Sequence, residues 1–216
     1  MEEGFVHKCG GMCLNKRRDE IMAEKGDNFW VGVLVGVIGA IGTGIAIYCA
    51  GKKIDPRRKI RELINQYQFH TTIRKVAADI TQNCNAGDSV CEVSAIFNFV
   101  SNQIKYMSDP RRNDYFSNPL ETLNLRIGDC DCKSILLATL LESIGHETQV
   151  ALIPGHAFVR VSIKEEDITK LPQSAYYIED IGKVWVPLES TAEGAYIGWM
   201  SEASYNAVVT GNVAFG

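Results

Sequence analysis

The sequence predicts an α+β domain preceded by one transmembrane helix. The helix is predicted by an uncharged stretch of about 22 residues at 29–50, FWVGVLVGVIGAIGTGIAIYCA. Beyond it, apolar residues recur at helical spacing as far as residue 144 and then alternate in short runs, as they do in strands. Because helices come first and strands follow, we expect an α+β domain rather than a doubly wound sheet.

Changes in composition divide the chain into five parts. These are a polar arm at 1–28, the apolar span at 29–50, a basic linker at 51–59, the domain at 60–200 and a tail at 201–216. The chain has 216 residues, 46% hydrophobic and 22% charged, and can therefore bury a sizeable core. Its net charge of −4 provides no basic excess to neutralise phosphates, so we expect no nucleic-acid partner.

The apolar span is long enough to cross the hydrocarbon core of a bilayer, which is about 30 Å thick. Trp30 and Tyr48 lie near its ends, where aromatic side chains favour the interface, and the polar arm before it does not fit a cleaved signal peptide. We expect a single-pass protein of a cellular or virion membrane. The balance of basic residues slightly favours a cytoplasmic domain, and the spacing of Gly32 and Gly36 would allow homo-oligomers.

Two or three amphipathic helices are expected at the start of the domain, because residues 60–80 can form either one helix or two. Their apolar residues recur every three or four positions within 60–67, 73–80 and 93–104, and a long loop rich in Pro, Asp and Asn follows. Cys84 and Cys91 flank the turn-like segment NAGDSV, and they could form a disulfide or remain two thiols.

The segment GDCDCKS, residues 128–134, opens a helix that is apolar on nearly every side and is therefore expected to be buried. Asp129 or Asp131 can cap its first turn. Further on, β-branched and aromatic residues alternate in four runs that predict strands: QVALIP at 149–154, HAFVRVSI at 156–163, YYIED at 176–180 and KVWVPLES at 183–190.

Cys130, His156 and Glu189 form the candidate catalytic set. Cys130 begins the buried helix, where the helix dipole favours a thiolate, but the adjacent aspartates make a basic partner necessary. By strand alternation, His156 and Glu189 each point away from the apolar face of their strand. Cys130 would attack a carbonyl, His156 would exchange the proton and Glu189 would orient the imidazole, while the Cys130 N–H could bind the oxyanion.

The ordered motifs YMSDP, NPLETLNLRIGDCDCKS, GHAFVRV and WVPLEST resemble the transglutaminase-like superfamily of cysteine enzymes, in its prokaryotic and phage-type form. The resemblance covers roughly residues 60–192. It implies a papain-like core, in which the nucleophile helix packs on an antiparallel sheet, and it implies a triad of Cys130, His156 and Glu189. It also implies that no metal or other cofactor is needed. The chain departs from the family by Cys132, where an Asp is usual, and by Glu189 in place of the commoner Asp.

Several residues allow other interpretations. Asp180 or Glu179 could replace Glu189 beside the histidine, by the geometric criteria for acids and bases. Cys132 is expected to be an inert or packing thiol rather than a resolving cysteine. Three aromatic residues could line a substrate cleft or belong to the core: Tyr106, Trp185 and Trp199.

Metal binding is not expected from this sequence. His7, Cys9 and Cys13 could supply ligands, but no second ligand pair lies nearby in the sequence, as a structural zinc site requires.

The chemistry favours a membrane-anchored cysteine hydrolase that cleaves peptide or isopeptide amide bonds through a thioester acyl-enzyme, for example in cell-wall peptides. The partner would then be a peptide or protein substrate. Two other functions fit the same residues. One is an acyl-transferring transglutaminase, and the other is a structural or assembly protein of a membrane or virion that uses the fold as a binding platform.

Overall fold

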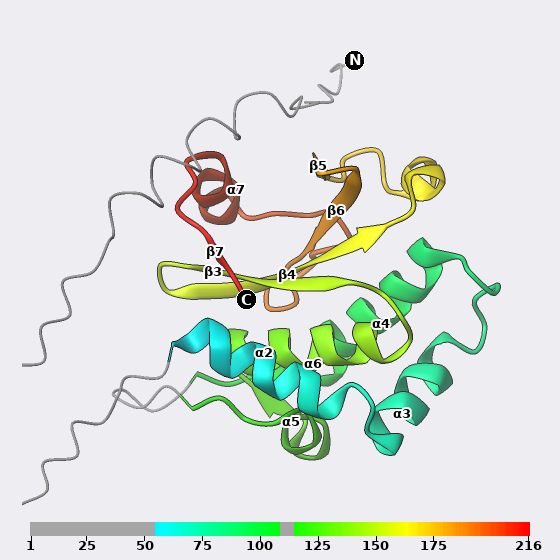
Figure 1. Cartoon of the computed structure of the whole chain (residues 1–216), viewed down its shortest axis with the longest axis vertical. Helices are drawn as coiled ribbons and strands as arrows, with labels where there is room; N and C mark the ends of the chain where they lie inside the picture. Colours follow the sequence, from blue (N-terminus) through cyan, green and yellow to red (C-terminus); the bar gives the residue numbers. More distant parts are fainter. Residues whose placement is uncertain (1–54, 109–114) are drawn as a thin grey trace, which may run out of the picture. The chain divides into compact units, whose positions relative to one another are not determined.

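The computed structural model describes residues 55–108 and 115–216 (Figure 1). The polar arm with its His7, Cys9 and Cys13, the apolar span at 29–50 and residues 51–54 of the basic linker lie outside these ranges. Among the helices in the two described ranges, none has both the length and the apolar character needed to cross a membrane.

Helices make up the first half of the domain, as the sequence predicts. They are α2 (Pro56–Tyr67), α3 (Thr71–Thr81), α4 (Ser89–Gln103), α5 (Pro119–Leu125) and α6 (Cys130–Ser143). A short parallel pair accompanies them, formed by β1 (Lys105–Tyr106) and β2 (Ile127–Gly128). Cys84 and Cys91, in the connection between α3 and α4 and the first turn of α4, are joined in a disulfide, so the first of the two alternatives is the one found.

The second half of the domain forms an antiparallel sheet with the strand order β5-β6-β4-β3-β7. Its elements are β3 (Thr148–Ile153), β4 (His156–Ile163), the 3-10 helix η1 (Glu165–Lys170), β5 (Ile178–Asp180), β6 (Lys183–Leu188), α7 (Glu202–Val209) and β7 (Ala214–Phe215). All neighbouring strands are antiparallel. The predicted α+β order of helices before strands is thus confirmed.

Helix α6 occupies the centre of the domain. Every residue from Cys132 to Leu141 is buried, which agrees with an apolar pattern that has no solvent-facing side. Helices α2 to α5 lie with α6 on one face of the sheet (Figure 1), and one continuous core joins them to the strands. On β4, Ala157, Val159 and Val161 point into this core, as strand alternation requires.

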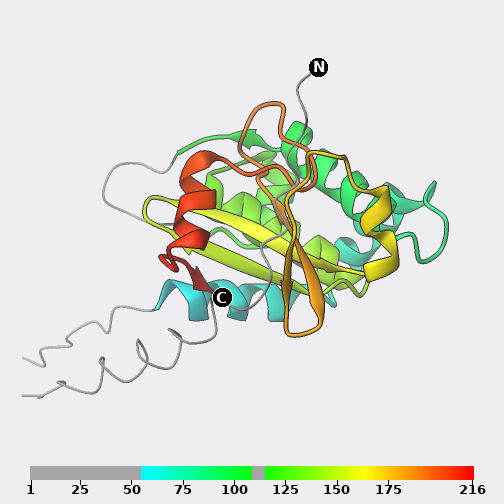
Figure 2. The same cartoon turned by 90° about the horizontal axis from the view of Figure 1, so that it is seen from above.

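The opposite face of the sheet is covered by α7 (Figure 2). Phe158 and Ala151 form a second, smaller apolar cluster there with Met200, and Val208 of α7 packs against it. Residues 201–216, for which the sequence pattern predicts only a tail, contribute a covering helix and the edge strand β7, which pairs with β3.

Lys133 is a buried cation that connects α6 to α4. Its side chain is almost completely enclosed, and its Nζ donates to the carbonyl oxygen of Ile104 at 2.9 Å and to that of Ser101 at 3.4 Å. These carbonyls lie at the C-terminal end of α4, where the helix dipole favours a positive charge. Burial nevertheless lowers the pKa of Lys133 to about 8.

We expect the wild-type protein to become more stable relative to Lys133→Met as the pH rises from about 8 to about 10.5. The folded pKa lies below the ordinary value, so the unfolded chain binds more protons in this window and stability rises with pH. The change should be about 3 kcal/mol, at about 1.4 kcal/mol for each pKa unit between the two values. Urea denaturation at several pH values measures it, and a difference between the two proteins that is independent of pH would contradict the prediction.

Candidate active site

The N-terminal turn of α6 presents Cys130, whose side chain is partly exposed. The Asp129 side chain caps the helix by accepting from the N–H of Cys132 at 3.0 Å, and the Asp129 carbonyl accepts from the N–H of Lys133. These bonds serve the later N–H groups of the turn. The Cys130 N–H is the first of the helix and lies at its N-terminus, the end of a helix that attracts negative charge.

Gly128 lets β2 lie directly against this turn. A Cβ atom at Gly128 would come within 2.9 Å of the Cys132 Cβ and 3.3 Å of the Thr122 Cγ2, distances that the packing cannot accommodate without movement. The glycine two positions before Cys130 is therefore required by the close approach of strand and helix.

His156 and Glu189 meet beside the sheet. His156 opens β4, and its Nε2 lies 2.6 Å from Oε2 of Glu189, the residue that follows β6. The pairing of Val159 with Leu188 in the antiparallel ladder puts Glu189 opposite Phe158, on the same face as His156. The histidine side chain is 25% exposed and the glutamate side chain 1%, so solvent reaches the pair from the imidazole side.

The thiol of Cys130 approaches the same imidazole. A hydrogen bond with Cys130, followed by the hydrogen bond with Glu189, raises the pKa of His156 to about 9, and burial opposes the rise. Because Nε2 faces Glu189, Nδ1 is the nitrogen left for the sulfur. At neutral pH the imidazole is therefore protonated, and it provides the cationic partner that a thiolate flanked by Asp129 and Asp131 needs.

Glu189 has a second partner that the sequence did not predict. The Ser204 hydroxyl, in α7, donates to Oε1 of Glu189, and both side chains are buried. The signal that could have revealed α7 is Ser201, an N-cap residue followed three positions later by a second serine and then by an apolar run.

Of the aromatic candidates, Tyr106 lies near Cys130. It lies opposite Gly128 in the β1–β2 pair and is 52% exposed. Partial burial and then the negative charges of Cys130, Asp129 and Asp131 raise the pKa of its hydroxyl. Trp185 is 3% exposed and carries the guanidinium of Arg160 on its ring, so it belongs to the interior; Trp199 is half-buried.

Cys132 differs sharply from Cys130, although one residue separates them. It is buried, it donates to the Tyr115 carbonyl at 3.3 Å, and it accepts from the N–H of Ser117 at 3.4 Å. Burial raises the pKa of Cys132 to about 11. The side chain that replaces the usual Asp therefore fastens the preceding loop to α6 and stays protonated.

The alternative acids lie elsewhere. Asp180 is 3.8 Å from the guanidinium of Arg160, and Glu179 is exposed on the edge strand β5. In the part of the chain that the structure describes, no group of three or more His, Cys, Asp or Glu side chains is arranged to hold a metal ion.

Comparison with known proteins adds a family. The model of the transglutaminase-like superfamily matches residues 74–189, which is more than half of the chain and includes Cys130, His156 and Glu189. No curated protein matches the sequence.

Solved structures with low identity also match. A candidate cysteine protease from Cytophaga hutchinsonii is 15% identical, over 76% of this chain and 52% of that one, with a TM-score of 0.42. A candidate protease from Parabacteroides distasonis is 13% identical, over 63% and 29%, with a TM-score of 0.42. Legionella pneumophila LapG is 17% identical, over 75% and 82%, with a TM-score of 0.41. The chain thus spans about half of the first protein and less than a third of the second.

The protonation of His156 can be followed directly. We expect its NMR titration to give a pKa of about 9 in the wild type and a value closer to 6.5 in Cys130→Ala, which removes the largest cause of the shift. Because the folded pKa exceeds the unfolded one, His156 stabilises the fold fully below about pH 6.5 and loses this contribution as the pH rises through about 9. Cys132→Ser is the matched control, and the pKa of His156 in this variant should equal the wild-type value. A wild-type value near 6.5 would contradict contact between the thiol and the imidazole.

Proposed function

The chain belongs to the transglutaminase-like superfamily, and from this membership and its site we propose that it is a membrane-anchored cysteine peptidase or amidase. The observation that carries the proposal is the pairing of His156 with the buried carboxylate of Glu189 at 2.6 Å, beside the partly exposed thiol of Cys130. The apolar span at 29–50 would be the anchor.

In the first half of the proposed reaction, the Cys130 thiolate attacks the carbonyl carbon of a substrate amide. A C–S bond forms, and the oxygen that becomes negative accepts from the Cys130 N–H at the start of α6. The His156 imidazolium then gives its proton to the leaving nitrogen, the C–N bond breaks and a thioester remains. The pKa of about 9 suits this step, because the proton is already on the histidine at neutral pH.

In the second half, neutral His156 takes a proton from water, and the resulting hydroxide equivalent attacks the thioester carbonyl. The C–S bond breaks, the carboxylic acid leaves, and the thiolate and imidazolium are restored. Glu189 keeps Nε2 of the imidazole in one orientation through both halves. If an amine replaces water in this half, the same residues transfer the acyl group instead.

A peptide is the favoured substrate because an exposed strand edge lies next to the nucleophile. In β1, the N–H groups of Lys105 and Met107 donate to carbonyls of Arg126 and Gly128 on the β2 side. The N–H and carbonyl of Tyr106 therefore project from the other edge, as parallel pairing requires. An extended peptide can add to such an edge as a further strand, with Tyr106 and Met107 offering apolar contacts.

We expect full-length protein in detergent micelles to cleave members of a peptide library, as detected by mass spectrometry. Cys130→Ala should abolish cleavage, and His156→Ala should slow it by about 10²–10⁴-fold, the usual contribution of a general acid and base. Cys132→Ser is the matched control and should retain activity. Hydroxylamine should trap the thioester as a hydroxamate in the wild type.

Two results would redirect the proposal. Ammonia release or product formation that requires an added amine would assign the protein to acyl transfer. Identical behaviour of the wild type and Cys130→Ala, with no trapped thioester, would overturn the enzymatic proposal and favour a binding platform.

We further infer that the domain faces an oxidising compartment, contrary to the slight cytoplasmic preference of the basic residues. The disulfide between Cys84 and Cys91 supports this, because disulfides persist outside reducing compartments.

Thiol blocking at the moment of cell lysis, followed by reduction and a mass-tagging maleimide, tests this location. We expect two tags that depend on prior reduction and are lost in a Cys84→Ser and Cys91→Ser double variant. If the first reagent blocks both cysteines, they are thiols in the cell and the domain lies in a reducing compartment.

A further inference from the structure

We propose that Ser204 is a positioning residue of the active site, which fixes the Glu189 carboxylate so that it can orient His156. The proposal rests on the proposed cysteine-peptidase function. It extends the site to α7, beyond the residues 74–189 that match the family.

The two oxygens of the Glu189 carboxylate have different partners. Oε2 is 2.6 Å from the imidazole of His156, and Oε1 accepts from the Ser204 hydroxyl. Glu189 is 1% exposed and Ser204 is fully buried, so solvent does not compete for either bond. A buried carboxylate held at both oxygens has lost the rotation about its last bond that would otherwise move it away from the histidine.

The direction of the Ser204 hydroxyl is also fixed. Ser201, the N-cap of α7, accepts from the N–H of Ser204 at 3.1 Å, and its own hydroxyl donates to Ser204 Oγ at 2.9 Å. Because Ser204 Oγ accepts one hydrogen from Ser201, its own hydrogen is available for Oε1 of Glu189. The bonds therefore run in one direction, from Ser201 through Ser204 to the carboxylate.

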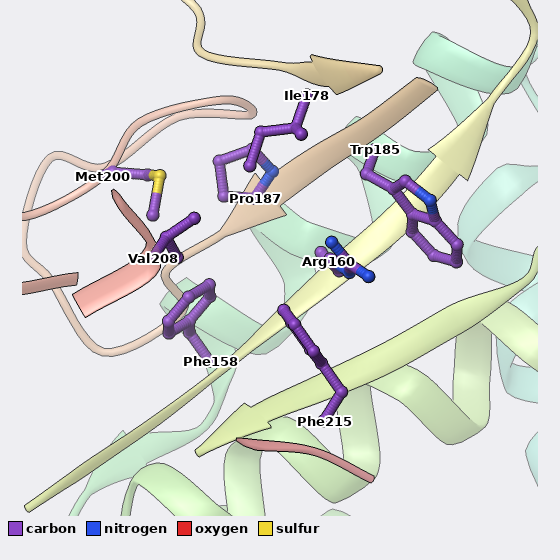
Figure 3. A pocket seen from close by; sticks show the side chains of 8 residues that line it. All are labelled: Phe158, Arg160, Ile178, Trp185, Pro187, Met200, Val208 and Phe215. Atoms are coloured by element: carbon purple, nitrogen blue, oxygen red, sulfur yellow. The ribbon is translucent and has the colours of Figure 1, made fainter. Parts of the chain in front are cut away.

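The position of α7 is determined by apolar packing rather than by the carboxylate. Met200 and Val208 lie against Phe158 on this face of the sheet (Figure 3), and the cavity among these side chains is only about 10 Å³. Such close packing holds Ser204 at a constant distance from the end of β6. This explains why a Glu serves here: its longer side chain has one more rotatable bond than Asp, and Ser204 removes the freedom that this bond adds.

The test compares Ser204→Ala with Ser204→Thr, which keeps the hydroxyl, and with Ile73→Val, which removes one methylene from the core in α3 and leaves α7 unchanged. For Ser204→Ala we expect kcat for peptide cleavage to fall by roughly 10–100-fold, with KM within about twofold, because an orienting group acts on the chemical step. We also expect the pKa of His156, measured by NMR, to fall from about 9 because its bond to Glu189 weakens. Ile73→Val should lower Tm without either change, and Ser204→Thr should keep both values as in the wild type.

A structural role alone would lower the Tm of Ser204→Ala and leave the His156 pKa and kcat as in the wild type, and that result would overturn the proposal. If Ser204→Ala does not fold, Ser204→Cys keeps a side chain of similar size with a weaker donor, and the same readouts apply. The NMR measurement needs no substrate. A wild type without peptidase activity whose His156 pKa still depends on Ser204 would therefore contradict the proposed function and leave the positioning role intact.

Discussion

The burial of α6 from Cys132 to Leu141 is the constraint from which the site follows. A helix that contacts apolar side chains on every side must be enclosed by the other helices on one side and by the sheet on the other. Its first turn is then the part where reactive groups can meet solvent, and this is where Cys130 lies. The same enclosure brings the start of β4 to that turn, because β4 packs on α6, and the end of β6 lies beside it because β6 pairs with β4.

The buried carboxylate of Glu189 imposes a second condition. An ionised group that is 1% exposed would be costly without partners, so the fold must supply hydrogen-bond donors to it. His156 is one donor and Ser204 is the other. The protonated imidazole of His156 carries the charge that compensates the buried carboxylate. The same hydrogen bond therefore stabilises the buried Glu189 and holds the imidazole beside Cys130.

Much of this architecture is readable from the sequence, for reasons that can be named. Helix and strand can be distinguished in the longer elements, because their apolar residues recur often enough to show a period of 3.6 or a period of two. This holds for the long helices and for β3, β4 and β6. The same alternation puts His156 and Glu189 on one face of the sheet, and the structure has them there. The sequence GDCDC by itself predicts a thiol in the first turn of a helix that an aspartate caps, and Cys130 lies there.

The remaining features depend on tertiary contacts that short segments do not encode. The helix α5 has only 7 residues. Its start signals, an Asn118 cap followed by Pro119, are residue types that equally predict a loop, so the sequence does not distinguish the two. The partner of Ser204 lies 15 positions earlier, so no local pattern could connect them. Trp185 could equally have lined a cleft by its residue type, and only the packing of Arg160 on its ring assigns it to the interior.

The contrast between the two thiols of α6 has a consequence for chemical probes. Cys130 is partly exposed beside an imidazolium, whereas Cys132 is enclosed and keeps its proton until about pH 11. An electrophilic warhead can reach the sulfur of the first, whereas the sulfur of the second is enclosed and protonated. A covalent inhibitor directed at this segment would therefore modify Cys130 alone in folded protein. A second adduct on the same peptide would mark molecules in which Cys132 has become accessible through unfolding.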